Sequence, residues 1–205
     1  MCPVIMLNGH ILEIRTRTWH RDRSLRLSQG DPAVLTQPAH TVLFLCTGNS
    51  CRSILAEALL NELGNGEFQA YSAGSKPAGF VHPHALACLN HNRIPVFQPH
   101  SKTWDDFSDM PLDLVVTVCD NAAGEACPIF SGSPAKVHWG LPDPALATGS
   151  DAEIAEVFQT VFESLQNHIK VFVDEVASSD QPDLAEIAKN IGTPEVPELN
   201  LGPAS

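Results

Sequence analysis

Apolar runs of strand length alternate with helical patterns through the middle of the chain. Val42–Cys46 and Leu114–Cys119 are the two clearest runs, and they are typical of parallel strands that are covered on both faces. Phe68–Ala73 and Lys136–Trp139 are weaker strand candidates. Because strands alternate with helices, the pattern predicts βαβ units and an α/β domain of three layers over residues 40–178.

Three segments carry the periodicity of a helix. After the first strand, apolar residues recur at helical spacing until Gly64 supplies a stop. Pro83–Leu89 is expected to form a short helix. Ser150 and Glu153 form a capping box that opens a long amphipathic helix, whose apolar positions are Phe158, Val161, Phe162, Leu165, Ile169 and Phe172.

The two ends of the chain lack such patterns. Residues 1–39 show no sustained period of either kind, and we expect a poorly ordered leader there. Residues 179–205 are acidic and contain four prolines. Leu184, Ile187 and Ile191 have the spacing of one short helix, but the composition favours a mobile tail.

Composition and charge exclude several classes of protein. With 43% apolar and 18% charged residues, the 205-residue chain is globular rather than disordered or fibrous. No apolar stretch approaches the ~20 residues of a membrane helix. The net charge is −12, of which residues 1–39 contribute +2 and the remainder −14. Such a surface repels phosphate backbones, so we expect neither nucleic acid nor a membrane as partner, and any anionic substrate needs a well-formed local site.

Cysteine usage indicates a reducing compartment. The six cysteines, at positions 2, 46, 51, 88, 119 and 127, are too few for a disulfide scaffold in a chain of this length. The N-terminus does not have the pattern of a secretory signal. We therefore expect a cytoplasmic protein whose thiols are available for redox or nucleophilic chemistry.

The most informative segment joins the first strand to the first helix. Cys46 ends the strand, Arg52 follows after five residues, and Ser53 opens the helix. Backbone N–H groups of such a loop form a cup for a tetrahedral oxyanion, and the helix N-terminus adds about half a positive charge. The guanidinium of Arg52 adds two further donors. The predicted oxyanion-binding residues are Thr47, Gly48, Asn49, Ser50, Cys51 and Ser53.

The same loop predicts a reactive thiol. We expect its positive field to lower the pKa of Cys46 well below ~8.5, so that the thiolate is the nucleophile. The hydroxyl of Ser50 or Ser53 is placed to hydrogen-bond the sulfur. Gly48 and Asn49 are residue types that tolerate the left-handed backbone that such a ring requires.

These residues resemble a known family. The sequence from Val42 to Ser53 resembles the phosphate-binding loop of the low-molecular-weight protein tyrosine phosphatase superfamily, and its Thr-Gly-Asn-Ser-Cys-Arg-Ser portion resembles the arsenate reductase branch. The resemblance continues through residues 71–75, 118–128 and 139–144, and covers about 41–175. It implies a four-stranded parallel sheet flanked by helices. It also implies that Asp143 is the general acid that protonates the leaving oxygen.

Two further cysteines favour reduction over hydrolysis. Reducing arsenate takes two electrons, so a second thiol has to attack the adduct that Cys46 forms with arsenic. Cys119 follows the second clear strand, and parallel strands end at one edge of a sheet, which brings it near Cys46. The resemblance implies a relay from a Cys46–Cys119 to a Cys119–Cys127 disulfide.

The resemblance leaves the reductant and the reaction class open. The interval between Cys119 and Cys127 is one residue longer than in thioredoxin-coupled members of the family, so thioredoxin and glutathione with glutaredoxin both remain candidates. A low-molecular-weight protein tyrosine phosphatase with phosphate-ester substrates is the alternative function. An oxyanion-sensing binding module is a third.

The chain departs from its relatives at two positions. Some relatives bind potassium through side chains that correspond to Asn49, Glu57, Ser72 and position 102, where this chain has Lys102. We expect the ammonium to pair with Glu57 and to replace the cation. Phosphatases of the superfamily place a tyrosine just after the Asp-Pro pair, whereas Ala145 stands here, which favours a small inorganic oxyanion.

We expect no bound metal or other cofactor. His82 and His84 lack a ligand partner at a recognised spacing, and we expect them on a helix surface.

Overall fold

The structure, a computed structural model, describes residues 4–7, 10–13, 38–119, 129–199 and 201. The chain divides into two units, Met1–Thr36 and Gln37–Ser205. In the first unit, β1 (Val4–Leu7) and β2 (His10–Glu13) pair in antiparallel fashion. The sequence analysis predicted no element there, and these two strands were missed.

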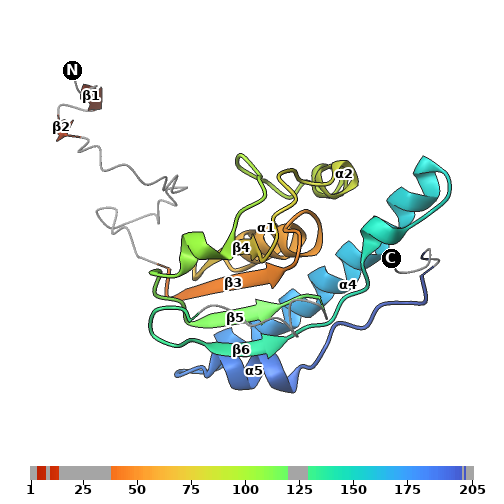
Figure 1. The fold of residues 1–205 in the computed structure, drawn as a ribbon. Coiled ribbons are helices and arrows are strands. Elements are labelled where there is room, and N and C mark those ends of the chain that lie inside the picture. The colour runs from red at the N-terminus through yellow and green to blue at the C-terminus, as the bar shows by residue number, and fades with distance from the viewer. Residues whose placement is uncertain (1–3, 8–9, 14–37, 120–128, 200, 202–205) are drawn as a thin grey trace. The chain divides into compact units, whose positions relative to one another are not determined.

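The second unit contains the predicted four-stranded parallel sheet. Its strands are β3 (His40–Cys46), β4 (Phe68–Gly74), β5 (Leu114–Thr117) and β6 (Ala135–His138). Their order is β4-β3-β5-β6, and every neighbouring pair is parallel (Figure 1). The carboxyl ends of β3 and β5 therefore lie at the same edge of the sheet, which is the edge where ligands bind in open α/β folds.

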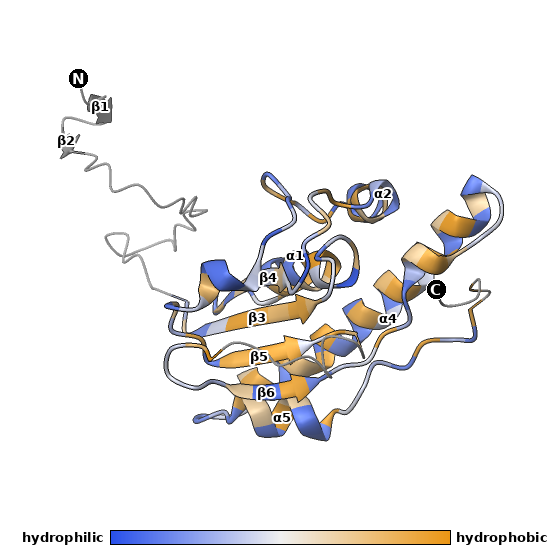
Figure 2. Cartoon of the chain, viewed as in Figure 1, coloured by the Kyte–Doolittle hydropathy of each residue, from blue (hydrophilic) through white to orange (hydrophobic). Residues whose placement is uncertain are grey.

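Helices α1 (Arg52–Leu63), α4 (Asp151–Ala177) and α5 (Leu184–Asn190) cover one face of the sheet, and α2 (Pro83–His91) packs against α1 and α4. The predicted capping box begins α4, and its buried stripe packs into a core with β3, β4 and β5 (Figure 2). Among the described residues, the 3-10 helix η1 (Trp104–Phe107) covers part of the other face. A second 3-10 helix, η2 (Pro144–Leu146), precedes α4. The three-layer α/β fold is as predicted.

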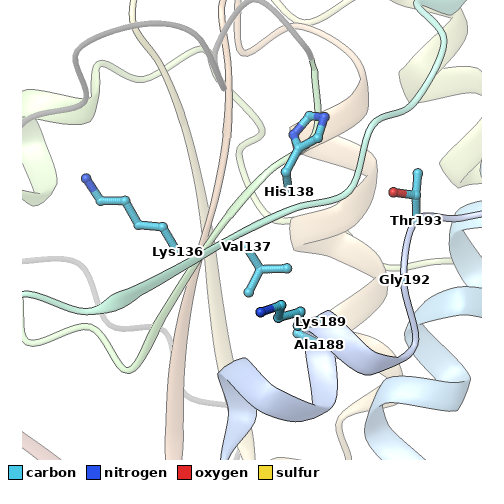
Figure 3. A pocket seen from close by; sticks show the side chains of 7 residues that line it. All are labelled: Lys136, Val137, His138, Ala188, Lys189, Gly192 and Thr193. Carbon is cyan, nitrogen blue, oxygen red and sulfur yellow. The ribbon is translucent and has the colours of Figure 1, made fainter.

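Within residues 179–205, where we expected a mobile tail, residues 184–190 instead form the helix α5. Leu184 and Ala188 of α5 are buried, and the indole Nε1 of Trp139 donates a hydrogen bond to the carbonyl of Ala188, at 3.0 Å. Figure 3 shows Val137 of β6 directed toward α5. A seven-residue helix is marginal on its own, so its stability comes from this packing, which local composition does not reveal.

None of the helices in the described ranges is long and apolar enough to cross a membrane.

Candidate active site

The loop from Cys46 to Arg52 is held by the segment that follows β4. Its carbonyl groups point outward and accept hydrogen bonds. The backbone N–H groups of Ser75, Lys76, Ala78 and His82 donate, at 2.9–3.2 Å, to the carbonyls of Cys46, Thr47, Gly48 and Ser50. Gly74 permits this approach, because a Cβ there would lie 2.5 Å from the carbonyl oxygen of Thr47. With its carbonyls engaged outside, the loop turns amide groups inward, as an oxyanion site requires.

Asn49 fixes the shape of the loop. It is fully buried and has a left-handed backbone, with φ +44°, as predicted. Gly48, for which the same conformation was predicted, does not have a positive φ. The side-chain Nδ2 of Asn49 donates to the hydroxyls of Ser53 and Ser72, each at 2.9 Å, and its Oδ1 accepts from the backbone N–H of Lys102, at 2.7 Å.

Cys46 lies at the base of the loop, and the residue is 4% exposed. The backbone N–H of Asn49 and the hydroxyl of Ser53 each lie 3.0 Å from Sγ. Burial raises the pKa of the Cys46 thiol, while the Ser53 hydroxyl, the Arg52 charge and the Asn49 N–H act to lower it. The expectation of a depressed pKa is therefore wrong for this arrangement, because burial outweighs the loop's positive field.

Arg52 and Asp143 meet beside the loop. The Nη2 of Arg52 lies 2.6 Å from Oδ2 of Asp143, and its Nη1 donates to the carbonyl of Leu141, at 2.9 Å. The other carboxylate oxygen of Asp143 accepts from the N–H of Ala145 and so caps η2. The fold thus brings the predicted acid to the predicted cation. The charge of the same carboxylate acts to raise the pKa of the Cys51 thiol, whereas that of Arg52 acts to lower it.

Cys119 lies at the same edge of the sheet. It follows β5 by two residues, and the preceding N–H of Val118 donates to the carbonyl of Leu45 of β3, at 2.8 Å. The sulfur of Cys119 is buried and lies 3.6 Å from the hydroxyl of Thr47. Its charge also acts on Cys46, raising the pKa of that thiol. The second predicted thiol is therefore beside the loop, whereas Cys127 lies outside the described residues.

Cys51 has a different role. Its side chain is buried in the core, and burial raises its pKa to about 12. The hydroxyl of Ser50 lies 3.7 Å from the Cys51 sulfur, so of the two serines considered only Ser53 contacts Cys46. Cys51 contributes packing and a loop amide rather than a reactive thiolate.

Lys102 pairs with Glu57 as predicted. Their Nζ and Oε2 atoms are 3.0 Å apart, and both side chains are largely covered. Ser72 donates a short hydrogen bond to the same carboxylate oxygen of Glu57 and accepts one from Asn49. The ammonium thus belongs to the cluster that positions Asn49.

The histidine pair at the start of α2 packs against α4. His82 caps the helix through Nδ1 and stacks on Phe158, and His84 pairs with Asp151, at 3.3 Å. Among the described residues, no group of three or more His, Cys, Asp and Glu side chains is placed to hold a metal.

Sequence reasoning did not identify the donors outside the loop. The N–H groups of residues 75–82 and the hydroxyl of Ser101, which donates to the carbonyl of Gly48 at 3.0 Å, hold its shape. Backbone donors carry no residue-type signal. Gly74, the last residue of β4, was the one sequence feature that could have indicated a close approach between this strand and the loop.

Comparisons with known proteins agree with this geometry. The family model described as low molecular weight phosphotyrosine protein phosphatase matches residues 41–181. An arsenate reductase of Halalkalibacterium halodurans is 39% identical over 133 residues, which are 65% of this chain and 94% of that protein. An arsenate reductase of Bacillus subtilis is 36% identical over 133 residues, with the same coverage of both chains.

Solved structures show the same fold. An arsenate reductase in the phosphate binding state matches with a TM-score of 0.56 and 26% identity, covering 66% of this chain and 98% of that one. The tyrosine phosphatase Wzb from Escherichia coli K30, in complex with sulphate, matches with a TM-score of 0.55, 66% and 96% coverage and 19% identity, which shows the fold alone.

Proposed function

The chain belongs to the low molecular weight phosphotyrosine protein phosphatase family, and within that family we propose that it reduces arsenate to arsenite. The observation that carries this proposal is the position of Cys119, whose thiol contacts Thr47 of the loop that holds Cys46. Hydrolysis needs one thiol, whereas reduction needs two within reach of each other. Relatives named arsenate reductase, 36–40% identical to this chain, support the same reading.

In the first step, Cys46 attacks arsenic. The loop amides and Arg52 hold the oxygens of the arsenate. To do so, the guanidinium of Arg52 leaves Asp143 and binds the oxyanion. An S–As bond forms and an As–O bond breaks. The carboxylate of Asp143, released from Arg52, accepts the thiol proton and delivers it to the leaving hydroxyl, which departs as water. The N-terminus of α1 stabilises the negative charge.

In the second step, Cys119 attacks the Cys46 sulfur. The S–S bond forms as the S–As bond breaks, and arsenic keeps the bonding electron pair, so arsenate is reduced to arsenite while two thiols are oxidised. The proton of the Cys119 thiol leaves on arsenite. Cys127 then attacks Cys119, and the resulting Cys119–Cys127 disulfide is reduced by an external thiol, either thioredoxin or glutathione with glutaredoxin.

A phosphatase is the second candidate, because Cys46, Arg52 and Asp143 also suffice for hydrolysis of a phosphate ester. Two features disfavour aryl phosphates. Ala145, which follows the Asp-Pro pair, is exposed and small, and the one tyrosine of the chain, Tyr71, lies in β4 against Phe107. The site therefore suits an inorganic oxyanion, with residual hydrolysis of reactive esters.

The test is arsenate-dependent oxidation of NADPH, coupled in turn to thioredoxin with its reductase and to glutathione with glutaredoxin and its reductase. One of the two systems is expected to support turnover. The Cys119→Ser variant is expected to lose arsenate reduction and to retain hydrolysis of p-nitrophenyl phosphate. Normal arsenate reduction by that variant would refute the two-thiol mechanism. Rapid phosphotyrosine hydrolysis without arsenate reduction would favour the phosphatase.

A further inference from the structure

The chain continues well beyond its family. The family model ends at residue 181, and the Bacillus subtilis relative is covered over 94% of its own length by 65% of this chain. The described chain nevertheless continues through α5 to Leu201. We call residues 182–201 the C-terminal extension. It packs against β6 and α4 and meets the segment that carries Asp143 at two points.

The first contact is at the start of that segment, which we call the Asp143 loop (residues 139–147). Trp139 is fully buried, and its backbone N–H donates to the carbonyl of Thr117 of β5, at 2.8 Å. Its indole Nε1 donates to the carbonyl of Ala188 in α5. A buried indole N–H needs an acceptor, and here the C-terminal extension supplies it. Figure 3 shows Ala188 and Lys189 beside Val137 of β6, with Gly192 and Thr193 following along the same side.

The second contact is at the end of the Asp143 loop. Beyond α5, Pro194 is buried and Val196 packs against the core. Ser164 of α4 donates a hydrogen bond to the carbonyl of Glu195, which holds this stretch along α4. Leu201 then pairs in antiparallel fashion with Ala147, the residue that ends η2.

Between these two points the Asp143 loop is also held by Leu141, which is buried in the core, and by η2, whose Pro144 is buried. Leu141 accepts a hydrogen bond from Arg52, and Asp143 pairs with the same guanidinium. Residues 148–150, which lead from Ala147 to α4, are exposed. In the mechanism proposed above, Arg52 leaves Asp143 for the oxyanion. From that moment the carboxyl is held by the packing of Leu141 and η2 and by the contacts at the two ends of the loop.

We propose that the C-terminal extension is a positioning element for the general acid, holding the Asp143 loop at Trp139 and at Ala147. The proposal rests on the proposed function in that Asp143 is the proton donor. Proton transfer requires a separation of about 2.6–3.2 Å between heavy atoms, and a displacement near 1 Å costs about 10²-fold in rate. A short tether at this loop is therefore expected to have a measurable effect on turnover.

Two shortened chains, differing by three residues, test the proposal. A chain that ends at Glu198 lacks the Leu201–Ala147 pairing but keeps α5, Pro194 and Val196, whereas a chain that ends at Leu201 keeps every contact named above. Amide hydrogen exchange is expected to be faster over residues 139–147 in the first chain than in the second, and equal in β3 and β5. Equal exchange over residues 139–147 would overturn the proposal.

Turnover supplies the second readout. With arsenate as substrate, the chain that ends at Glu198 is expected to have a kcat about tenfold lower and an unchanged KM. In an Asp143→Ala background, the two chains are expected to have the same kcat, which a merely structural role would not produce. Equal kcat values for the two chains that retain Asp143 would contradict the proposal. So would a difference in kcat between the two chains that is as large in the Asp143→Ala background.

If the chain that ends at Glu198 does not fold, the full-length double variant Leu199→Gly, Leu201→Gly replaces it, with the same expected results. If no chain reduces arsenate, the proposed function fails, and the exchange comparison alone then decides whether the C-terminal extension holds the loop.

Discussion

Arg52 and Asp143 form an ion pair beside the Cys46–Arg52 loop, with Nη2 and Oδ2 2.6 Å apart. In the proposed mechanism the same guanidinium also binds the oxyanion. Binding of substrate is therefore expected to compete with the ion pair. Burial and the nearby Cys119 raise the pKa of the Cys46 thiol, against the lowering effects of the Ser53 hydroxyl, the Arg52 charge and the Asn49 N–H.

Removing the carboxylate is expected to make Cys46 more acidic. In Asp143→Ala, the charge of Arg52 is no longer offset, so the pKa of Cys46 falls relative to the unmodified chain. Alkylation by iodoacetamide, followed across pH 6–10 with loss of arsenate turnover as a second readout, measures this. The rate at pH 8 should rise while kcat falls about 10²-fold or more. Asp109→Ala, at an exposed carboxylate elsewhere, is the control. An unchanged alkylation profile would show that the ion pair does not control the thiol.

Ser53→Ala is expected to have the opposite effect on the thiol. The Ser53 hydroxyl lies 3.0 Å from the Cys46 sulfur and lowers its pKa. Such a hydrogen bond contributes about 0.5–1.5 kcal/mol. Its loss is therefore expected to slow alkylation of Cys46 severalfold at pH 8. Ser50→Ala, whose hydroxyl contacts the Cys51 sulfur instead, is the matched control and should react like the unmodified chain. Equal rates for the two variants would argue against a role for Ser53.

Stability is expected to decrease on acidification through the half-buried His168. Burial lowers the pKa of His168, against an opposing hydrogen bond with the backbone of Gly192, and His168 packs edge-on against Trp139. Its folded pKa lies below the unfolded value of about 6.5, so protons bind the unfolded chain more readily. The free energy of unfolding is therefore fully present above about pH 6.5 and falls as the pH drops below it.

Urea unfolding of the unmodified chain and of His168→Gln at pH 7.5 and 5.0 measures this contribution. The variant is expected to lose less stability between the two pH values than the unmodified chain does. A larger loss in the variant would mean that His168 does not titrate as its burial indicates.

Lys102 is expected to make the enzyme independent of potassium. Its ammonium pairs with Glu57 in the cluster that holds Asn49. Arsenate reduction in potassium and in sodium buffers of equal ionic strength should therefore proceed at the same rate. Lys102→Asp restores an acidic side chain beside Glu57 and should make the rate rise with potassium. A potassium requirement in the unmodified chain would contradict this role of Lys102.

Local sequence patterns predicted the elements that local forces determine. The apolar run ending at Cys46, the loop and the capping box of Ser150 and Glu153 each contain their own signal, and the structure confirms them. The approach of Cys119 to the loop followed from parallel topology alone, because both strands end at one edge of the sheet.

The features that sequence reasoning missed depend on residues far apart in the chain. The helix α5 is stabilised by Trp139, about fifty residues earlier, whose indole N–H it satisfies. The pKa of Cys46 depends on burial by the whole core, which charge counting around the loop does not measure. The ion pair between Arg52 and Asp143 likewise depends on the fold, because Asp143 reaches Arg52 from the segment that follows β6.

The most direct test is to map the disulfide that arsenate produces. In a Cys127→Ser variant, the relay should stop at its first disulfide, so one equivalent of arsenate added to the reduced protein is expected to yield one equivalent of arsenite. Peptide mass mapping should then show Cys46 joined to Cys119, and an equal addition of phosphate should leave both thiols free. If arsenate leaves Cys46 and Cys119 unlinked, the account of this protein as a two-thiol reductase is contradicted.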